Sequence, residues 1–121
     1  MTSTKLLGAW GESIAAQYLK KKKYKIIASG FRSRFGEIDL IVANRKYLAF
    51  VEVKLRKSSG FAYAYEHVDK YKMDRLRTTA QLYLSQNPTT LQPRFDVIEI
   101  YAPEGTQTTN PVIHHMEGAF E

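Results

Sequence analysis

The sequence predicts an α/β fold in which a mixed central β-sheet is flanked by helices, with the elements in the order αβββαβ. Three observations predict it. An amphipathic helix opens the chain, three apolar strand-like runs follow within residues 24–55, and a second long helix leads to a fourth run. Because a strand–helix–strand connection usually joins parallel neighbours, the third and fourth strands should be parallel and the first three should form an antiparallel meander.

The first helix is expected over residues 4–22. Its apolar side chains recur at steps of three and four and so share one face, as Leu7, Trp10, Ile14 and Tyr18 do. Lysines at positions 20–23 follow at the C-terminal end, where the helix dipole favours cations. Glu12 is expected at the margin of the buried face.

The three strands of the meander are expected over residues 24–28, 38–43 and 47–55. The second and third are almost continuously apolar, which is typical of central strands covered on both faces. Asn44-Arg45-Lys46 predicts a turn between them. Residues 29–36 are expected to be a basic, flexible connection.

The second half of the chain begins with an expected loop at residues 57–60. A helix over residues 65–85 is predicted by its apolar side, and Asn87-Pro88 ends it. The fourth strand is expected over residues 94–101. A polar loop at 103–111 and a short edge strand at 112–116 should follow.

Length and composition predict one domain over residues 1–121. The chain has 44% hydrophobic and 25% charged residues, which is ordinary for a folded globular protein. Its net charge of +6 favours an anionic partner such as nucleic acid, although a surface tuned for solubility is an equal alternative. The absence of cysteine excludes disulfides, thiolate zinc sites and a cysteine nucleophile. Polar residues interrupt any secretion signal, so a cytoplasmic protein without membrane contact is expected.

The most informative residues are Asp39, Glu52 and Lys54. Glu52 and Lys54 are two apart in a strand and must point to the same face. A two-residue loop between the second and third strands would place Asp39 opposite Glu52. A four-residue loop would place it opposite Phe50, still on that face, whereas a three-residue loop would separate the acids.

Two carboxylates and an ammonium on one sheet face suit a divalent cation beside a polarised water, and Glu37 lies on the face of Asp39. The alternative is a decorative cross-strand Glu–Lys pair, which is common on exposed sheets. The apolar neighbours of Glu52 favour a functional role. Glu12 is either a solvated flank or a further acid of this cluster.

Several cations accompany these acids. Lys72 falls in line with Val68 and Leu76 at four-residue steps, so its stem could pack while its head escapes to solvent, or its ammonium could reach a phosphate. Arg32, Arg34 and Arg56 are expected to contact phosphates or to belong to a solvated face. Tyr63 and Tyr65 could stack on bases or pack against the helix. The three histidines, His67, His114 and His115, lack a convincing partner set for a metal site.

The segments Gly36-Glu37-Ile38-Asp39-Leu40-Ile41 and Phe50-Val51-Glu52-Val53-Lys54 closely resemble the YraN-like family of bacterial predicted endonucleases. Two positions depart from its patterns. Ile38 precedes Asp39 where the wider superfamily has proline, and Gly30 precedes Phe31 where the family often has asparagine. The resemblance also covers Gly11-Glu12, Arg56, the run Val68, Lys72, Leu76 and Ala80, Arg94-Phe95-Asp96-Val97, and Gly118-Ala119-Phe120.

The resemblance implies a restriction-endonuclease-like fold, similar to that of archaeal Holliday junction resolvases. It implies that Asp39, Glu52 and Glu12 bind Mg²⁺ or Mn²⁺ and that Lys54 assists the attacking water. The expected function is metal-dependent endonucleolytic hydrolysis of DNA, with branched DNA among the substrates and a homodimer as the assembly. A nucleic-acid-binding module without activity is the first alternative, and an interaction domain with structural ion pairs is the second.

Overall fold

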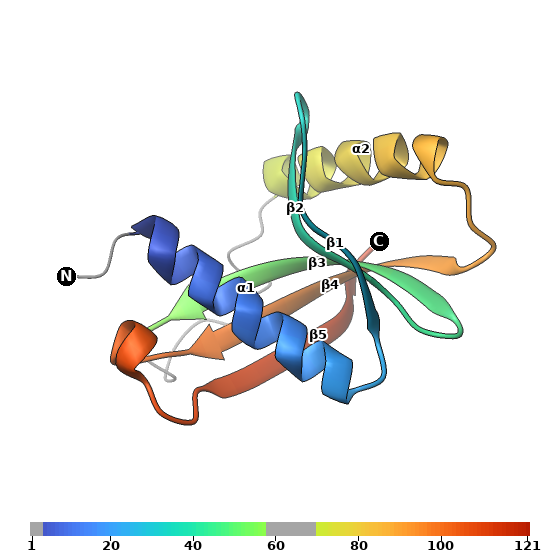
Figure 1. Ribbon diagram of the computed structural model, residues 1–121. Helices are drawn as coiled ribbons and strands as arrows, with labels where there is room; N and C mark the ends of the chain where they lie inside the picture. Colours follow the sequence, from blue (N-terminus) through green and yellow to red (C-terminus); the bar gives the residue numbers. More distant parts are fainter. Residues whose placement is uncertain (1–3, 58–69) are drawn as a thin grey trace.

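In residues 4–57 and 70–121, which the computed structural model describes, five strands form one mixed sheet that is flanked by two long helices (Figure 1). The elements in chain order are α1 (Thr4–Lys21), β1 (Lys25–Ser33), β2 (Gly36–Ala43), β3 (Tyr47–Arg56), α2 (Lys70–Gln86), β4 (Gln92–Tyr101), the short 3₁₀ helix η2 (Gly105–Gln107) and β5 (Val112–Phe120). The predicted α/β class is therefore confirmed. Tyr63, Tyr65 and His67 lie outside the described residues.

The strands follow one another in the sheet in the order β1-β2-β3-β4-β5. The pairs β1–β2, β2–β3 and β4–β5 are antiparallel, whereas β3–β4 is parallel. The expected meander and the expected parallel pair on either side of α2 are both confirmed. This topology places β3 in the centre of the sheet.

The turn between β2 and β3 contains two residues, which decides among the loop lengths that the sequence left open. The ladder runs from Leu40 opposite Val51 to Ala43 opposite Leu48, and the Asn44 amide donates to the Tyr47 carbonyl at 3.0 Å. The Asn44 side-chain oxygen also accepts from the amides of Lys46 and Tyr47, at 2.9 and 2.7 Å. This capped turn fixes the register in which Asp39 falls opposite Glu52.

Residues 29–36 form most of a hairpin arm, so the expectation of a flexible connection is wrong. The β1–β2 ladder continues to Ser33 opposite Gly36, and Figure 1 shows the arm rising past α2. Gly30 adopts a φ of 67°, a conformation that glycine tolerates, and the strand continues through it. Phe31 then packs edge-to-face on Tyr83 of α2, with ring centroids 5.3 Å apart. This contact anchors the arm to the helix.

Both faces of the central strands are buried. Ile41, Phe50 and Val97 pack beneath α2 together with Leu76 and Tyr83 of that helix. On the opposite face, α1 covers a second cluster, which contains Ala15, Leu19, Val42, Val51 and Ile98. The nearly continuous apolar character of β2 and β3 follows from this double coverage.

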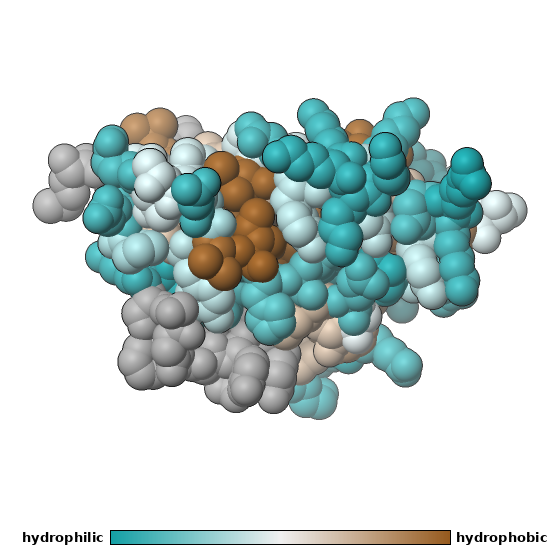
Figure 2. Space-filling view, turned by 90° about the horizontal axis from the view of Figure 1, so that it is seen from below, coloured by the Kyte–Doolittle hydropathy of each residue, from teal (hydrophilic) through white to brown (hydrophobic). Residues whose placement is uncertain are grey.

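The last strand is longer than the five residues expected. It continues to Phe120, whose ring stacks on that of Phe95 at 4.8 Å, and the Gly118 amide donates to Asp96. These contacts join the end of the chain to β4. Seen from below, the surface is mainly hydrophilic, with a compact apolar area near the middle of the view and smaller apolar spots at its upper edge (Figure 2). No described helix is long and apolar enough to cross a membrane.

Candidate functional site

Asp39, Glu52 and Lys54 converge on the face of the sheet that also carries α2. Asp39 Oδ2 accepts a hydrogen bond of 2.8 Å from the Val53 amide, so the acid of β2 is fixed directly to β3. Lys54 Nζ lies 3.3 Å from Glu52 Oε1. Glu52 is only 8% exposed, although it carries a charge. The register and the alternation of side chains along β3 therefore bring the three groups together as the sequence predicts.

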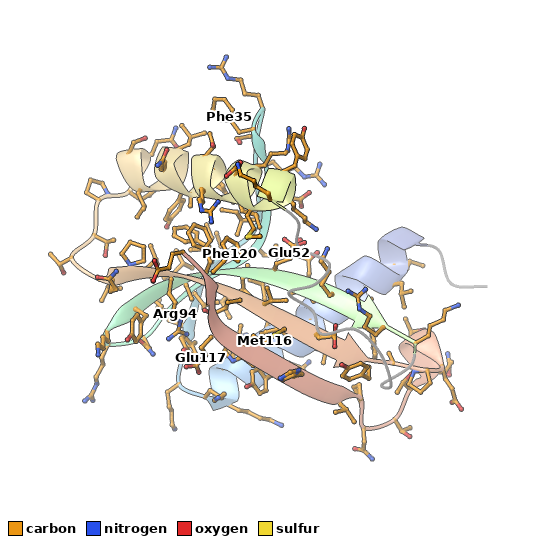
Figure 3. All side chains as sticks on the ribbon, turned by 180° about the vertical axis from the view of Figure 1, so that it is seen from behind. Phe35, Glu52, Arg94, Met116, Glu117 and Phe120 are labelled. Carbon is orange, nitrogen blue, oxygen red and sulfur yellow. The ribbon has the colours of Figure 1, made fainter. Side chains whose placement is uncertain are left out.

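Lys72 joins the same carboxylate from α2. Its Nζ lies 2.7 Å from Glu52 Oε1, the oxygen that Lys54 also contacts. Figure 3 shows Glu52 between β3 and α2. Sequence reasoning placed Lys72 on the apolar side of its helix but did not identify this partner. The signal was its position four residues before Leu76, which packs into the core under α2.

Burial and mutual repulsion shift the protonation of these groups. Desolvation, followed by the negative charge of Glu52, raises the pKa of Asp39 from 3.8 to about 7, although the Val53 amide opposes the rise. Burial, together with the neighbouring Lys72 ammonium, lowers the pKa of Lys54. For Lys72, burial acts to lower the pKa, but hydrogen bonds to Glu52 and Lys54 raise it overall. The cluster therefore holds one acid that resists ionisation and one amine that loses its proton more easily.

Glu12 lies beside this cluster at the margin of α1. The helix approaches β3 closely at Gly11, where a Cβ atom would come within 3.1 Å of the Leu55 side chain. Desolvation, then the negative charges of Glu37 and Glu52, raise the pKa of Glu12. Glu12 is therefore close enough to these acids to be repelled by them. Glu37 itself is exposed and pairs with Arg32 at 3.5 Å.

The carboxylates of this cluster supply part of the ligand set that a hard divalent cation requires. Asp39 and Glu52 supply two carboxylates with repelling charges, and Mg²⁺ typically takes one or two carboxylates and completes its shell with water and phosphate oxygens. Within residues 4–57 and 70–121, no three carboxylate or imidazole groups form a ready metal cage. Glu12 is therefore a neighbour of the two-acid pair, and its role as a third ligand stays a prediction.

A pocket of about 620 Å³ opens beside the acids, between the β1–β2 arm and α2. Its lining combines three acids with three cationic side chains, so an anion that enters beside a bound cation would meet positive charge there. Arg75, which sequence reasoning missed, follows Lys72 on α2 by three residues and donates to the Tyr71 hydroxyl at 3.2 Å. The lining residues are Arg32, Ser33, Gly36, Glu37, Asp39, Glu52, Lys72 and Arg75.

The remaining cations predicted to contact phosphate lie elsewhere. Arg34 is exposed and its guanidinium lies 4.9 Å from the centre of the Phe35 ring, and Figure 3 shows Phe35 at the tip of the arm. Arg56 instead pairs with the fully buried Glu99, at 3.1 Å from Nε to Oε2, and Tyr101 donates to the other oxygen of that carboxylate. Arg56 thus neutralises an internal charge, which limits its freedom to follow a phosphate.

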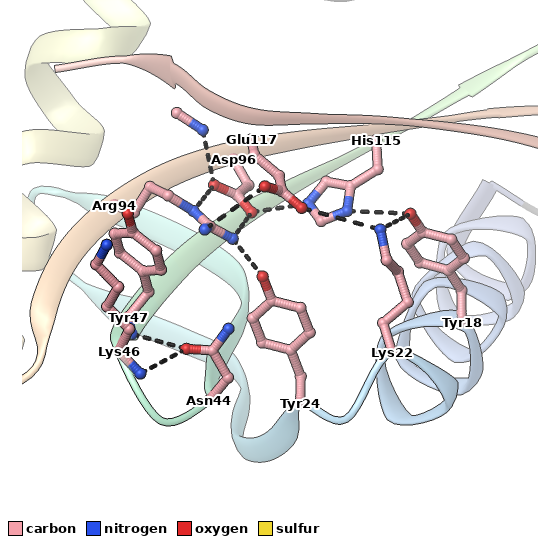
Figure 4. A network of polar contacts seen from close by, with 11 residues as sticks. Tyr18, Lys22, Tyr24, Asn44, Lys46, Tyr47, Arg94, Asp96, His115 and Glu117 are labelled. Carbon is pink, nitrogen blue, oxygen red and sulfur yellow. Dashed lines mark hydrogen bonds and ion pairs between the residues drawn. The ribbon is translucent and has the colours of Figure 1, made fainter.

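A second polar cluster, on the α1 face of the sheet, was not predicted from the sequence (Figure 4). The buried Asp96 accepts two hydrogen bonds of 2.8 Å from Arg94, and His115 Nε2 lies 2.7 Å from it. His115 Nδ1 lies 3.1 Å from the Tyr18 hydroxyl, and Arg94 donates to Tyr24. Burial acts to raise the pKa of Asp96, but these hydrogen bonds lower it overall. The cluster ties β4 and β5 to α1 and stabilises the fold.

Comparison with known proteins gives one consistent family. Residues 11–100 match the model described as "Uncharacterised protein family UPF0102". The chain is 45% identical over 118 residues to a UPF0102 protein of Caldanaerobacter subterraneus subsp. tengcongensis, covering 96% of this chain and 95% of the relative. It is 41% identical over 109 residues to a UPF0102 protein of Syntrophomonas wolfei, covering 89% and 95%.

A UPF0102 protein of Nocardia farcinica is 40% identical over 115 residues, covering 94% of this chain and 88% of the relative. None of these names specifies an activity. The matched residues include α1 from Gly11 onward, the arm, both acids of the site, α2 and most of β4. The chain therefore belongs to uncharacterised protein family UPF0102, which is the YraN-like group that its motifs resemble.

Proposed function

We propose that this protein is a Mg²⁺- or Mn²⁺-dependent nuclease that hydrolyses phosphodiester bonds in DNA. The convergence of Asp39, Glu52 and Lys54 on one sheet face carries the proposal. Two carboxylates of which one resists ionisation form a site that a cation would stabilise, and perturbed acids in a pocket are typical of functional sites. The pocket beside them is lined by the positive charge that a phosphate requires.

Asp39 and Glu52 would hold the cation, and Glu12 would contribute through a bridging water. A divalent cation at such a site polarises a phosphoryl oxygen and lowers the pKa of a coordinated water. Lys54 is the candidate general base, because its lowered pKa makes the neutral amine more accessible and Nζ could then accept a proton from the attacking water. Arg32, Arg75 and Lys72 would orient the substrate phosphate in the pocket.

The substrate class follows from charge and from the family resemblance. A net charge of +6 favours a polyanion, and the exposed Arg34 extends the positive surface along the arm. Branched DNA and a homodimer are proposed from the similarity to Holliday junction resolvases, because two-fold symmetry suits the cutting of two strands.

The test is single-turnover cleavage of branched, single-stranded and duplex DNA with Mg²⁺ or Mn²⁺. Asp39→Asn and Glu52→Gln should each abolish most of the cleavage, whereas Glu104→Gln, an exposed acid in the loop after β4, should cleave like the parent. The nuclease assignment is wrong if both site variants cleave as fast as the parent protein.

A nucleic-acid-binding module without activity is the second candidate. It is favoured by the two ammonium groups on Glu52, which already neutralise this carboxylate from within the protein. In that case Asp39→Asn should tighten DNA binding, the parent should bind no Mn²⁺, and affinity should fall steeply with salt. Measuring DNA affinity at several salt concentrations with both proteins separates the two candidates.

A further inference from the structure

Lys72 contacts the same carboxylate that is proposed to bind the cation. Its Nζ lies 2.7 Å from Glu52 Oε1, and Lys54 Nζ lies 3.3 Å from that oxygen. Two positive charges therefore already converge on one oxygen of a nearly buried acid. A divalent cation on Glu52 would lie beside both of them, and like charges at such short range repel strongly.

The two lysines differ in how readily their ammonium groups can move away from Glu52. Lys54 extends from the central strand β3, and 19% of its side chain is exposed. Lys72 is the third residue of α2, and 36% of its side chain is exposed. Lys72 also lines the pocket between the arm and α2, so its ammonium has space to move into. The ammonium of Lys72 is therefore the one that a cation can displace at lower cost.

The same pocket offers the displaced ammonium a new partner. Arg75 and Arg32 line it with Lys72, so a phosphate in this pocket would face cationic side chains from both the arm and α2. A lysine suits an exchange of this kind, because its compact ammonium turns on a flexible stem. An arginine would hold Glu52 through a rigid two-pronged contact.

We propose that Lys72 is an exchangeable counter-ion of Glu52: a divalent cation displaces it, and the freed ammonium then binds a phosphate of the nucleic acid. The inference rests on the proposed function and adds an order of binding to it. The cation binds first, and its binding releases Lys72 to contact the phosphate. Cation and nucleic acid should therefore bind with positive coupling that depends on Lys72.

The first experiment measures Mn²⁺ alone, by isothermal titration calorimetry, with no DNA present. Lys72→Met removes the competing ammonium and should tighten Mn²⁺ binding by about tenfold, equivalent to about 1.4 kcal/mol. Arg75→Met is the matched control: it removes one cation from the same pocket wall, but its guanidinium is bonded to Tyr71. Its Mn²⁺ affinity should stay within about twofold of the parent.

The second experiment measures binding of branched DNA by fluorescence anisotropy, with and without Ca²⁺ as a carboxylate-binding cation. Lys72→Met should weaken DNA binding in Ca²⁺ by about tenfold and have little effect without it, because Lys72 is then held by Glu52. Arg75→Met should weaken binding by a similar factor under both conditions. Thermal unfolding checks that the variants fold, and Lys72→Gln should repeat the Lys72→Met result.

Equal or weaker Mn²⁺ binding by Lys72→Met would overturn the exchange, as would a loss of DNA affinity that is the same with and without Ca²⁺. Lys72 would then be a fixed ion-pair partner. The Glu52→Gln variant separates this failure from a failure of the proposed function. If the parent binds Mn²⁺ no better than Glu52→Gln does, the metal site itself is wrong, and the exchange falls with it.

Discussion

Replacing Asp39 with asparagine should stabilise the folded protein above neutral pH. Asparagine keeps the shape of the side chain, and its carbonyl oxygen can still accept the hydrogen bond from the Val53 amide. The substitution removes only the negative charge, which burial and Glu52 disfavour. The charge of Asp39 would thus lower folding stability, as expected of a residue that is kept for function and not for the fold.

The size of the effect follows from the pKa of Asp39. A rise from 3.8 to about 7, at about 1.36 kcal/mol per pH unit, corresponds to an upper limit of about 4 kcal/mol. Asp39 keeps some solvent contact and interacts with Glu52, so we expect about 2 kcal/mol. Because the folded state binds the proton more tightly than the unfolded state, the stability of the parent should fall as pH rises from about 4 to about 7.

Urea unfolding at intervals from pH 4 to pH 8.5 measures this difference. The two proteins should be nearly equal in stability at pH 4, and Asp39→Asn should gain its full advantage by pH 8. Asp74→Asn is the control, because the pKa of Asp74 is lowered, chiefly by its hydrogen bond to Lys70, and its loss should be slightly destabilising. An Asp39→Asn protein that is less stable than the parent at pH 8, or a difference that does not change with pH, would refute the reasoning.

Three further predictions concern catalysis and packing. Lys54→Met should slow single-turnover cleavage by about 10²- to 10⁴-fold, the usual contribution of a general base, with DNA affinity unchanged; an equal loss of affinity would contradict this role. Asp96→Asn should cost about 3 to 5 kcal/mol in urea unfolding, because it removes the buried negative charge that neutralises the Arg94 guanidinium, while Mn²⁺ affinity should stay as in the parent. Gly11→Ala should be no more stable than the parent in urea unfolding, because the gain of about 1 kcal/mol in helix propensity is offset where the new methyl group approaches the Leu55 side chain to 3.1 Å; a variant that gains the full amount would show that Leu55 yields without cost.

The central meander could be predicted because its determinants are local. The apolar character of β2 and β3 reflects coverage on both faces, and Asn44 caps the turn that sets their register. The loop length itself stayed open, since a two-residue and a four-residue loop both satisfy the alternation of side chains. The β1–β2 arm was missed because Gly30 looks like a breaker, while the contact of Phe31 with Tyr83 links residues far apart in the chain.

The site, like the fold, could be predicted where it depends on local pattern and not where it depends on packing between distant elements. Asp39, Glu52 and Lys54 share a face by strand periodicity, which needs only the sequence. The ion pair from Lys72 to Glu52 depends on how closely α2 packs on the sheet, and no local pattern encodes that distance. The contact of His115 with Asp96 was missed because it depends on the β4–β5 register, which no local pattern in the sequence encodes.

The most direct test of the central claim measures the Tm of the parent and of Glu52→Gln at increasing Mn²⁺ concentrations. If Asp39 and Glu52 together bind the cation, Mn²⁺ at about a hundred times its Kd should stabilise the parent by about 2.7 kcal/mol, a rise in Tm of about 10 °C. Glu52→Gln should show little or no rise. An equal response of the two proteins, or none in the parent, would contradict a metal site at these acids.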